Sequence, residues 1–218
     1  MMAKFGIITP TIPGRERYLC RCSGSIQDQD IARGDEVSFL HLICGDGFTP
    51  EFEAPHTVVR GIPQAGGWGN PVREAMVQAF AKEVDYFLFV DDDNILLPSA
   101  LFKLNRVGSD KEMIISRMLI MNRGEMQMGR NATDVVQYVL PPSLEALNNN
   151  QIGSLNMCVR SAVASRCHWD PAKYNGDCLF FVDCLRAIGG TADWRAALFN
   201  PRVFYLNEIL SVWCRYGM

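Results

Sequence analysis

The chain has 218 residues, of which 48% are hydrophobic and 21% are charged. That length suits one sizeable domain with its own core and is too short for two ordinary domains, so we predict a single domain over residues 1–218. A net charge of -3 argues against a protein whose affinity rests on a broad basic face, as it does in many nucleic-acid-binding proteins. A local basic cleft remains compatible with this charge.

Eight cysteines are spread along the chain, several of them inside apolar runs, and no C-x-x-C pair occurs. We therefore predict buried free thiols in a reducing cytoplasm rather than disulfides or a structural zinc site. The opening residues are typical of a short strand rather than a signal peptide. No apolar stretch reaches the ~18 residues that a membrane span needs. We expect a cytoplasmic protein without a transmembrane segment, at most peripheral to a membrane.

Strand-like and helix-like segments alternate through the first half of the chain. The predicted strands are residues 4–9, 37–44, 56–62 and 86–90, and the predicted helices are residues 15–29, 71–82 and 98–104. The fourth strand, YFLFV, is a continuous apolar run typical of a central strand that is buried on both faces. Pro71 is well suited to the first turn of its helix. The alternation predicts an α/β fold with a mostly parallel sheet and right-handed crossovers.

The second half of the chain is less regular. Strands are predicted at residues 113–121, 153–159, 203–206 and 209–214, and a helix at residues 176–188, before the pair Gly189-Gly190. Residues 122–150 are rich in Asn, Gly, Met and Pro and have no clear assignment. Neither an internal repeat nor a linker separates the two halves, which favours one domain.

The strongest local motif is the run of Asp91, Asp92 and Asp93 directly after the fourth predicted strand. Adjacent carboxylates repel one another, but a divalent cation neutralises them, and oxygen ligands suit Mg²⁺ or Mn²⁺. A nucleotide diphosphate would supply further ligands, and the metal would offset the charge that builds on the leaving phosphate. The alternative is a solvated acidic turn or a helix N-cap near Asn94.

Two further residues are candidates for nucleotide binding. Asp46 lies in a Gly-Asp-Gly turn after the second strand, where it can accept from a base N–H or a ribose hydroxyl, or simply form the turn. Arg73 follows a Gly-rich loop in the first turns of a helix, where it can pair with Asp46, reach a diphosphate or lie on the surface. Loops that follow parallel strands meet at one edge of the sheet, so we expect one crevice lined by residues 10–17, 45–49 and 91–94.

Asp177 lies at the start of the last predicted long helix, in the segment Asn175-Gly176-Asp177. It can cap this helix, or it can act as a general base that deprotonates an acceptor hydroxyl. His41 alternates within a strand and is expected to be structural. Catalysis by Ser, His and Asp lacks a signature, because no G-x-S-x-G occurs.

The ordered set of motifs resembles the family 2 type of GT-A glycosyltransferases. KFGIITPTIPGR resembles the opening strand of that family, and LICGDG its second-strand Val-Asp-Asp-Gly segment. GGWGNPVREAM is similar to the Gly-x-x-x-Ala-Arg-Asn helix start, and YFLFVDDDNILLPSAL to the Asp-x-Asp strand with its following helix. WDPAKYNGDCLFFVDCLRAIGG resembles the Glu-Asp segment, and FYLNEILSVWCRYG the closing Tyr-Leu-x-Glu run. The resemblance covers nearly the whole chain.

This resemblance implies a single GT-A domain, Rossmann-like, with residues 1–105 as the nucleotide-sugar-binding half and residues 106–218 as the acceptor-binding half. By position, it assigns the nucleotide-sugar site to Pro10, Thr11, Arg15, Asp46, Arg73, Asp91 and Asp92, the metal site to Asp91 and Asp93, and the catalytic base to Asp177. Gly176 stands where the family has Glu, and Glu74 where it has Asn. The closing His that often binds the metal is absent after Arg215, so Asp93, the diphosphate and waters would hold it.

We therefore predict a metal-dependent, inverting glycosyltransferase that uses Mn²⁺ or Mg²⁺ and a nucleotide-diphosphate sugar, with a UDP-sugar favoured. The expected acceptor is a saccharide or another hydroxyl, and a hydroxymethylated base in DNA is the alternative. Acceptor contacts are expected in the unassigned segment, from Arg123, Met126, Met128 and Arg130. A sugar nucleotidyltransferase would need a Gly-rich basic loop after the first strand, which this chain lacks. A non-catalytic nucleotide-sugar-binding module would tolerate the loss of Asp177 and Asp93, and both are present.

Overall fold

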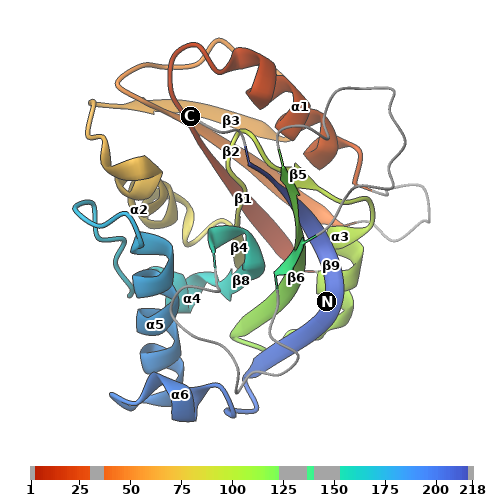
Figure 1. Ribbon diagram of the computed structural model, residues 1–218, viewed down its shortest axis with the longest axis vertical. Coiled ribbons are helices and arrows are strands. Elements are labelled where there is room, and N and C mark those ends of the chain that lie inside the picture. The colour runs from red at the N-terminus through yellow and green to blue at the C-terminus, as the bar shows by residue number, and fades with distance from the viewer. Residues whose placement is uncertain (1–2, 30–36, 123–136, 140–152, 216–218) are drawn as a thin grey trace.

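A computed structural model describes residues 3–29, 37–122, 137–139 and 153–215. Its strands form one sheet in the order β3-β2-β1-β4-β8-β6-β9-β5, with β7 paired to β6 (Figure 1). The strands are β1 (Lys4–Thr11), β2 (Ser38–Asp46), β3 (Thr57–Ile62), β4 (Tyr86–Phe89), β5 (Ile95–Leu96), β6 (Met113–Asn122), β7 (Gln137–Val139), β8 (Met157–Arg160) and β9 (Val203–Arg215). The predicted acceptor contacts at residues 123–130 lie outside the described residues.

The helices flank this sheet on both faces. They are α1 (Glu16–Gln27), α2 (Asn70–Phe80), α3 (Ala100–Arg106), α4 (Ser161–Ala164), α5 (Gly176–Gly189) and α6 (Trp194–Ala197), with short 3₁₀ turns η2 (Gly67–Gly69) and η5 (Ser154–Asn156). The four predicted helices are confirmed, each within two residues at either end. The short elements α4, α6 and β5 were not predicted, because four residues or fewer carry too little periodicity.

Strand direction confirms the predicted α/β class. Strands β1, β2, β3 and β4 run parallel to one another, and the long pairing of β6 with β9 is also parallel. The short strands β5, β7 and β8 run the other way. Since the parallel strands share one direction, their carboxyl ends lie at a common edge of the sheet.

Three predicted strands differ from the structure. The segment predicted as a strand at residues 153–159 begins instead as the 3₁₀ turn η5. Asn156 holds this turn, because its side chain accepts from Gly153 N at 3.1 Å and donates to Ser116 O at 2.9 Å. Strands predicted at residues 203–206 and 209–214 are one continuous strand, β9. A shift in its register against β6 near Arg117 absorbs the irregularity between them.

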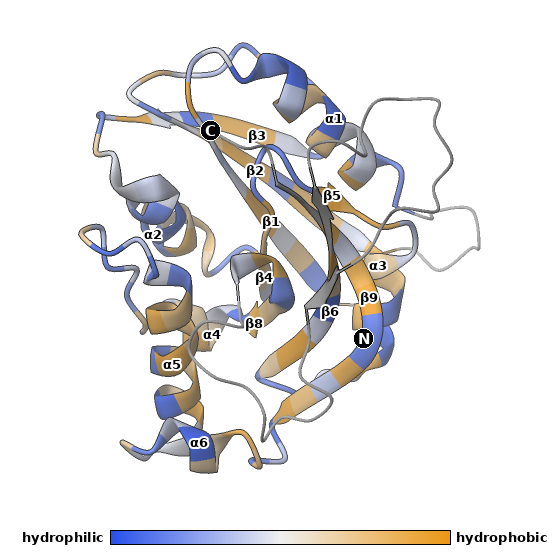
Figure 2. Ribbon diagram, viewed as in Figure 1, coloured by the Kyte–Doolittle hydropathy of each residue, from blue (hydrophilic) through white to orange (hydrophobic). Residues whose placement is uncertain are grey.

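The core has one apolar layer on each face of the sheet. Alternate residues of β4 point into different layers: Phe87 and Phe89 pack toward α2 and α5, whereas Tyr86 and Leu88 pack toward α1 and α3. All four are at most 6% exposed, which confirms the prediction of a strand buried on both faces. Figure 2 shows apolar and polar segments alternating along α5, as expected for a helix with one face against the sheet.

The cysteines described by the structure are free thiols, and Cys20 alone among them is exposed. The prediction of free thiols is therefore confirmed for this part of the chain. None of the described helices has the length and hydrophobicity that crossing a bilayer requires.

Candidate functional site

The aspartate turn lies at the carboxyl edge of the sheet, beside the end of β1. Thr11 Oγ1 donates to Asp92 Oδ2 at 2.7 Å, and Arg15 Nε donates to both Asp92 oxygens at 2.9 Å. Arg15 Nη2 also reaches Asp93 Oδ2 at 2.6 Å. Asp92 is 4% exposed, so its buried carboxylate stabilises the turn through these hydrogen bonds. Two of the three predicted loops therefore meet here.

On the other side of the turn, the side chain of Arg73 contacts several groups at once. It is 3% exposed, and its Nη2 forms an ion pair with Asp91 Oδ1. Its Nη1 donates to Trp68 O at 3.0 Å and to Asn70 Oδ1 at 3.2 Å, and the guanidinium lies 5.1 Å from the ring centroid of Trp169. Nε of Arg73 and Nε1 of Trp169 are buried donors without a hydrogen-bond partner among the described residues. A ligand oxygen that reaches these two N–H groups would accept their hydrogen bonds.

Asp46 does not pair with Arg73. Its two carboxylate oxygens accept from Ala65 N at 2.6 Å and Gly66 N at 2.8 Å, which ties the Gly-rich loop to the end of β2. The loop then passes close to Pro10: a Cβ atom at Gly69 would lie 3.0 Å from the Pro10 ring. Gly69 also has a φ of 81°, so both its space and its conformation require glycine. The third predicted loop therefore joins the site through the Gly-rich segment.

Asp177 lies in the first turn of α5, within electrostatic range of Arg73 and Asp91. Its Oδ2 accepts from Ser154 N at 2.9 Å, which is not a bond to its own helix, and the side chain stays partly exposed. Burial raises the pKa of Asp177, the positive charge of Arg73 lowers it in part, and the negative charge of Asp91 raises it further. These three side chains thus share one electrostatic environment. The bond to Ser154 N therefore argues against a simple helix-capping role for Asp177.

Asn70 explains why glycine precedes Asp177. Its Nδ2 donates to Asp170 O at 2.9 Å and to Lys173 O at 3.1 Å, and so joins the start of α2 to the turn before α5. A Cβ at Gly176 would lie 2.2 Å from this nitrogen. The glutamate of the resembling family therefore has no room at this position. Sequence reasoning missed Asn70, because its partners are backbone groups about a hundred residues away.

The donor set suits a hard cation only in part. Burial, together with the charge of Asp91, raises the pKa of Asp93 to about 6, although Arg15 offsets part of this rise. Across the described ranges, no cluster of three or more His, Cys, Asp or Glu side chains forms a ready metal site. The described residues leave Asp91 Oδ2 and Asp93 Oδ1 without a hydrogen bond, and two carboxylate oxygens fit Mg²⁺ or Mn²⁺ once a ligand completes the coordination.

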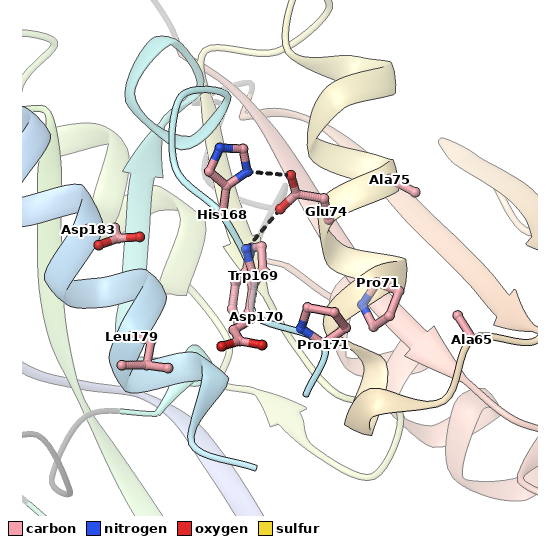
Figure 3. Close-up of a pocket in the computed structure, with 10 residues that line it drawn as sticks. All are labelled: Ala65, Pro71, Glu74, Ala75, His168, Trp169, Asp170, Pro171, Leu179 and Asp183. Carbon is pink, nitrogen blue, oxygen red and sulfur yellow. Dashed lines mark hydrogen bonds and ion pairs between the residues drawn. The ribbon is translucent and has the colours of Figure 1, made fainter. Parts of the chain in front are cut away.

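A groove of about 950 Å³ lies between α2 and α5, beside this site (Figure 3). Glu74 on α2 bonds His168 Nδ1 at 3.0 Å and Trp169 N at 2.9 Å across it. Glu74, at the family's Asn position, thus holds the loop that precedes α5. The lining residues are Ala65, Pro71, Glu74, Ala75, His168, Trp169, Asp170, Pro171, Leu179 and Asp183.

No protein-family model and no curated protein matches the chain. Among solved structures, the chain is similar to S. aureus TarS 1-349 in complex with UDP, with a TM-score of 0.68 and 16% identity over 97% of this chain and 60% of that chain. For the same fragment in complex with UDP-GlcNAc, the TM-score is 0.66 at 17% identity over 99% of this chain and 59% of that chain. For S. aureus TarS itself, the values are 0.63 and 15% over 97% of this chain and 37% of that chain.

The likeness shows that the chain has the α/β fold of these structures, a GT-A-like fold, which confirms the predicted fold class. The chain spans 60% or less of the length of these structures. At such low identity the fold is what is shared, so the family 2 assignment and the residue roles stay predictions.

Proposed function

We propose that this protein is a glycosyltransferase that moves a sugar from a nucleoside-diphosphate sugar, preferably a UDP-sugar, to an acceptor hydroxyl. The observation that carries this proposal is the convergence of Arg73, Asp91 and Asp177 at the carboxyl edge of the sheet. Ligands of open α/β sheets bind at that edge. The TarS structures of the same fold were solved with UDP and with UDP-GlcNAc, which supports this choice of donor.

On the donor side, Pro10, Thr11 and Asp46 are the proposed nucleotide contacts. Arg73 faces the position proposed for the diphosphate, where its fork of N–H groups suits phosphate oxygens. Asp93 and Asp91 are the proposed ligands of Mn²⁺ or Mg²⁺. A cation bound there would offset the negative charge that develops on the leaving diphosphate.

On the acceptor side, Asp177 is the proposed general base. Ser154 N fixes one carboxylate oxygen of Asp177, and the other oxygen is the one proposed to take the proton of the acceptor hydroxyl. Burial raises the pKa of Asp177, which increases its strength as a base in the ionised form. As Asp177 takes the proton, the hydroxyl oxygen bonds to the anomeric carbon and the bond to the diphosphate breaks. A single displacement of this kind inverts the configuration.

The test is release of UDP from UDP-sugars by wild type and Asp177→Asn, with Mn²⁺ present. The amide keeps the size of the side chain and cannot accept the proton, so we expect turnover to fall by about 100-fold or more. UDP affinity should stay within about twofold, because the change removes no proposed donor contact. Asp110→Asn is the matched control, since Asp110 lies on an exposed loop. Near-normal turnover in Asp177→Asn would reject the base assignment.

A further inference from the structure

Two aromatic side chains project into solvent at the rim of the candidate site. Trp68 is 61% exposed and Tyr174 is 79% exposed. Their rings meet edge to face, with centroids 5.6 Å apart. Tyr174 lies three residues before Asp177, and Trp68 five residues before Arg73. A large exposed aromatic pair beside a polar site is typical of a binding surface.

The backbone conformation at Trp68 is a second indication that its exposed ring serves binding. Its φ is 55°, in the left-handed region, between Gly67 and Gly69, whose φ values are 69° and 81°. Glycine adopts such values freely, whereas a bulky residue rarely does. The indole neither fills the core nor relieves strain, so folding does not account for tryptophan at this position. Strained residues of this kind gather at functional sites.

The loops that carry the two rings are held in place by hydrogen bonds and close packing. The Trp68 carbonyl accepts from Arg73 Nη1 at 3.0 Å. Gly67 packs so closely on Pro171 that a Cβ there would lie 2.6 Å from the Pro171 carbonyl oxygen. The turn that carries Tyr174 is fixed through the two hydrogen bonds of Asn70. The aromatic pair is thus a preformed surface, which lowers the entropic cost of binding.

We propose that Trp68 and Tyr174 form a platform that binds a sugar ring of a neutral saccharide acceptor, next to the proposed base Asp177. The C–H face of a pyranose ring is flat and apolar and stacks on an aromatic ring, while its hydroxyl groups stay free to be presented to a base. This inference rests on the proposed glycosyl transfer and names its acceptor class.

Charge distinguishes a saccharide from a nucleic acid, whose bases also stack on aromatic rings. Pro171, which touches the loop of Trp68, also lines the neighbouring groove, and Glu74, Asp170 and Asp183 line the same groove. These carboxylates accept hydrogen bonds from sugar hydroxyls and repel a phosphate backbone. The surface therefore favours a neutral saccharide over the hydroxymethylated DNA considered from the sequence.

The experiment titrates cellotriose, maltotriose and chitotriose, and separately a single-stranded oligo(dT), into the UDP-saturated protein by calorimetry. The variants are Trp68→Gly and Tyr174→Ala, and the control is Phe199→Ala, which removes another exposed ring, beyond α6. Trp68→Gly should unfold at the same or a higher temperature than wild type, because glycine accepts the positive φ. Loss of binding in this variant then reports the missing ring.

We expect at least one trisaccharide to bind wild type and Phe199→Ala equally, and to bind Trp68→Gly and Tyr174→Ala about tenfold or more weakly. Three results would overturn the platform: no trisaccharide binds wild type, removal of Trp68 leaves the affinity unchanged, or oligo(dT) is the ligand that depends on Trp68. UDP affinity, measured separately, tests the proposed function. If the protein binds a saccharide but not UDP, the proposed UDP-sugar donor is rejected and the proposed aromatic platform stands. If it binds UDP but no saccharide, the platform is rejected and the proposed donor stands.

Discussion

Replacing Arg73 by methionine keeps the length of a buried side chain and removes its charge. The change loses two hydrogen bonds, to Trp68 O and Asn70 Oδ1, worth about 1 kcal/mol each. It also loses the ion pair with Asp91, whose side chain is 35% exposed, so solvent screening limits this contribution to about 1 kcal/mol. Contact with the Trp169 ring adds roughly 0.5–1 kcal/mol.

The expected loss for Arg73→Met is therefore about 3–4 kcal/mol in the free energy of unfolding. For a chain of this size, each 1 kcal/mol lowers Tm by about 2–4 °C, so Tm should fall by roughly 6–16 °C. Urea denaturation followed by circular dichroism measures the loss directly. Arg186→Met is the matched control, because Arg186 is 48% exposed and its two contacts, with Asp183 and with Ala192 O, lie at the protein surface.

A double-mutant cycle with Asp91→Asn isolates the ion pair. Without Arg73, the charge of Asp91 has lost its partner, so Asp91→Asn should destabilise the Arg73→Met protein less than it destabilises wild type. Arg186→Met is expected to unfold within about 2 °C of wild type. If Arg73→Met does the same, the contacts of Arg73 do not stabilise this site as calculated.

Three further predictions concern stability. Gly176→Ala should destabilise the protein by about 2 kcal/mol or more in urea, because its Cβ would lie 2.2 Å from Asn70 Nδ2, and a wild-type midpoint would refute that packing. Burial lowers the pKa of His41 from 6.5 to about 3. The contribution of neutral His41 to stability is therefore complete above pH 6.5 and is lost as the pH falls from 6.5 through about 3. The urea midpoint should drop over this range, and His41→Gln should make the drop smaller. Burial raises the pKa of Asp93 from 3.8 to about 6, so stability from this group decreases as pH rises from about 4 to about 6. Asp93→Asn should therefore raise Tm at pH 8 in metal-free buffer and abolish stabilisation by Mn²⁺ with UDP, whereas a lower Tm at pH 8 would show that its bond to Arg15 dominates.

Regular elements and the edge of the sheet were predictable because both depend on local pattern. The apolar run of β4 ending in Asp91-Asp92-Asp93 predicts a central strand followed by a polar turn, and parallel topology brings that turn beside Thr11 and Arg15. Asp177 was also singled out from its place at the start of a predicted helix, and its role as a base stays a prediction. These features need only periodicity and chain direction.

The contacts that hold the site together were not predictable in the same way. Arg73 had Asp46 and a diphosphate as candidate partners, and only the packing of α2 against the sheet brings it to Asp91. Ser154 orients Asp177 through a backbone N–H, which carries no sequence signal. Trp68 stands out only once its exposure and positive φ are known. Tertiary packing decides all of these.

Calorimetric titration of UDP into the protein, with Mn²⁺ and then with EDTA, tests the central claim most directly. We predict that UDP binds in Mn²⁺, that EDTA weakens binding by about tenfold or more, and that Asp93→Asn binds UDP equally weakly in both buffers. UDP binding of the same strength in Mn²⁺ and EDTA would contradict the proposed metal site. Absence of UDP binding in either buffer would contradict the proposed UDP-sugar donor.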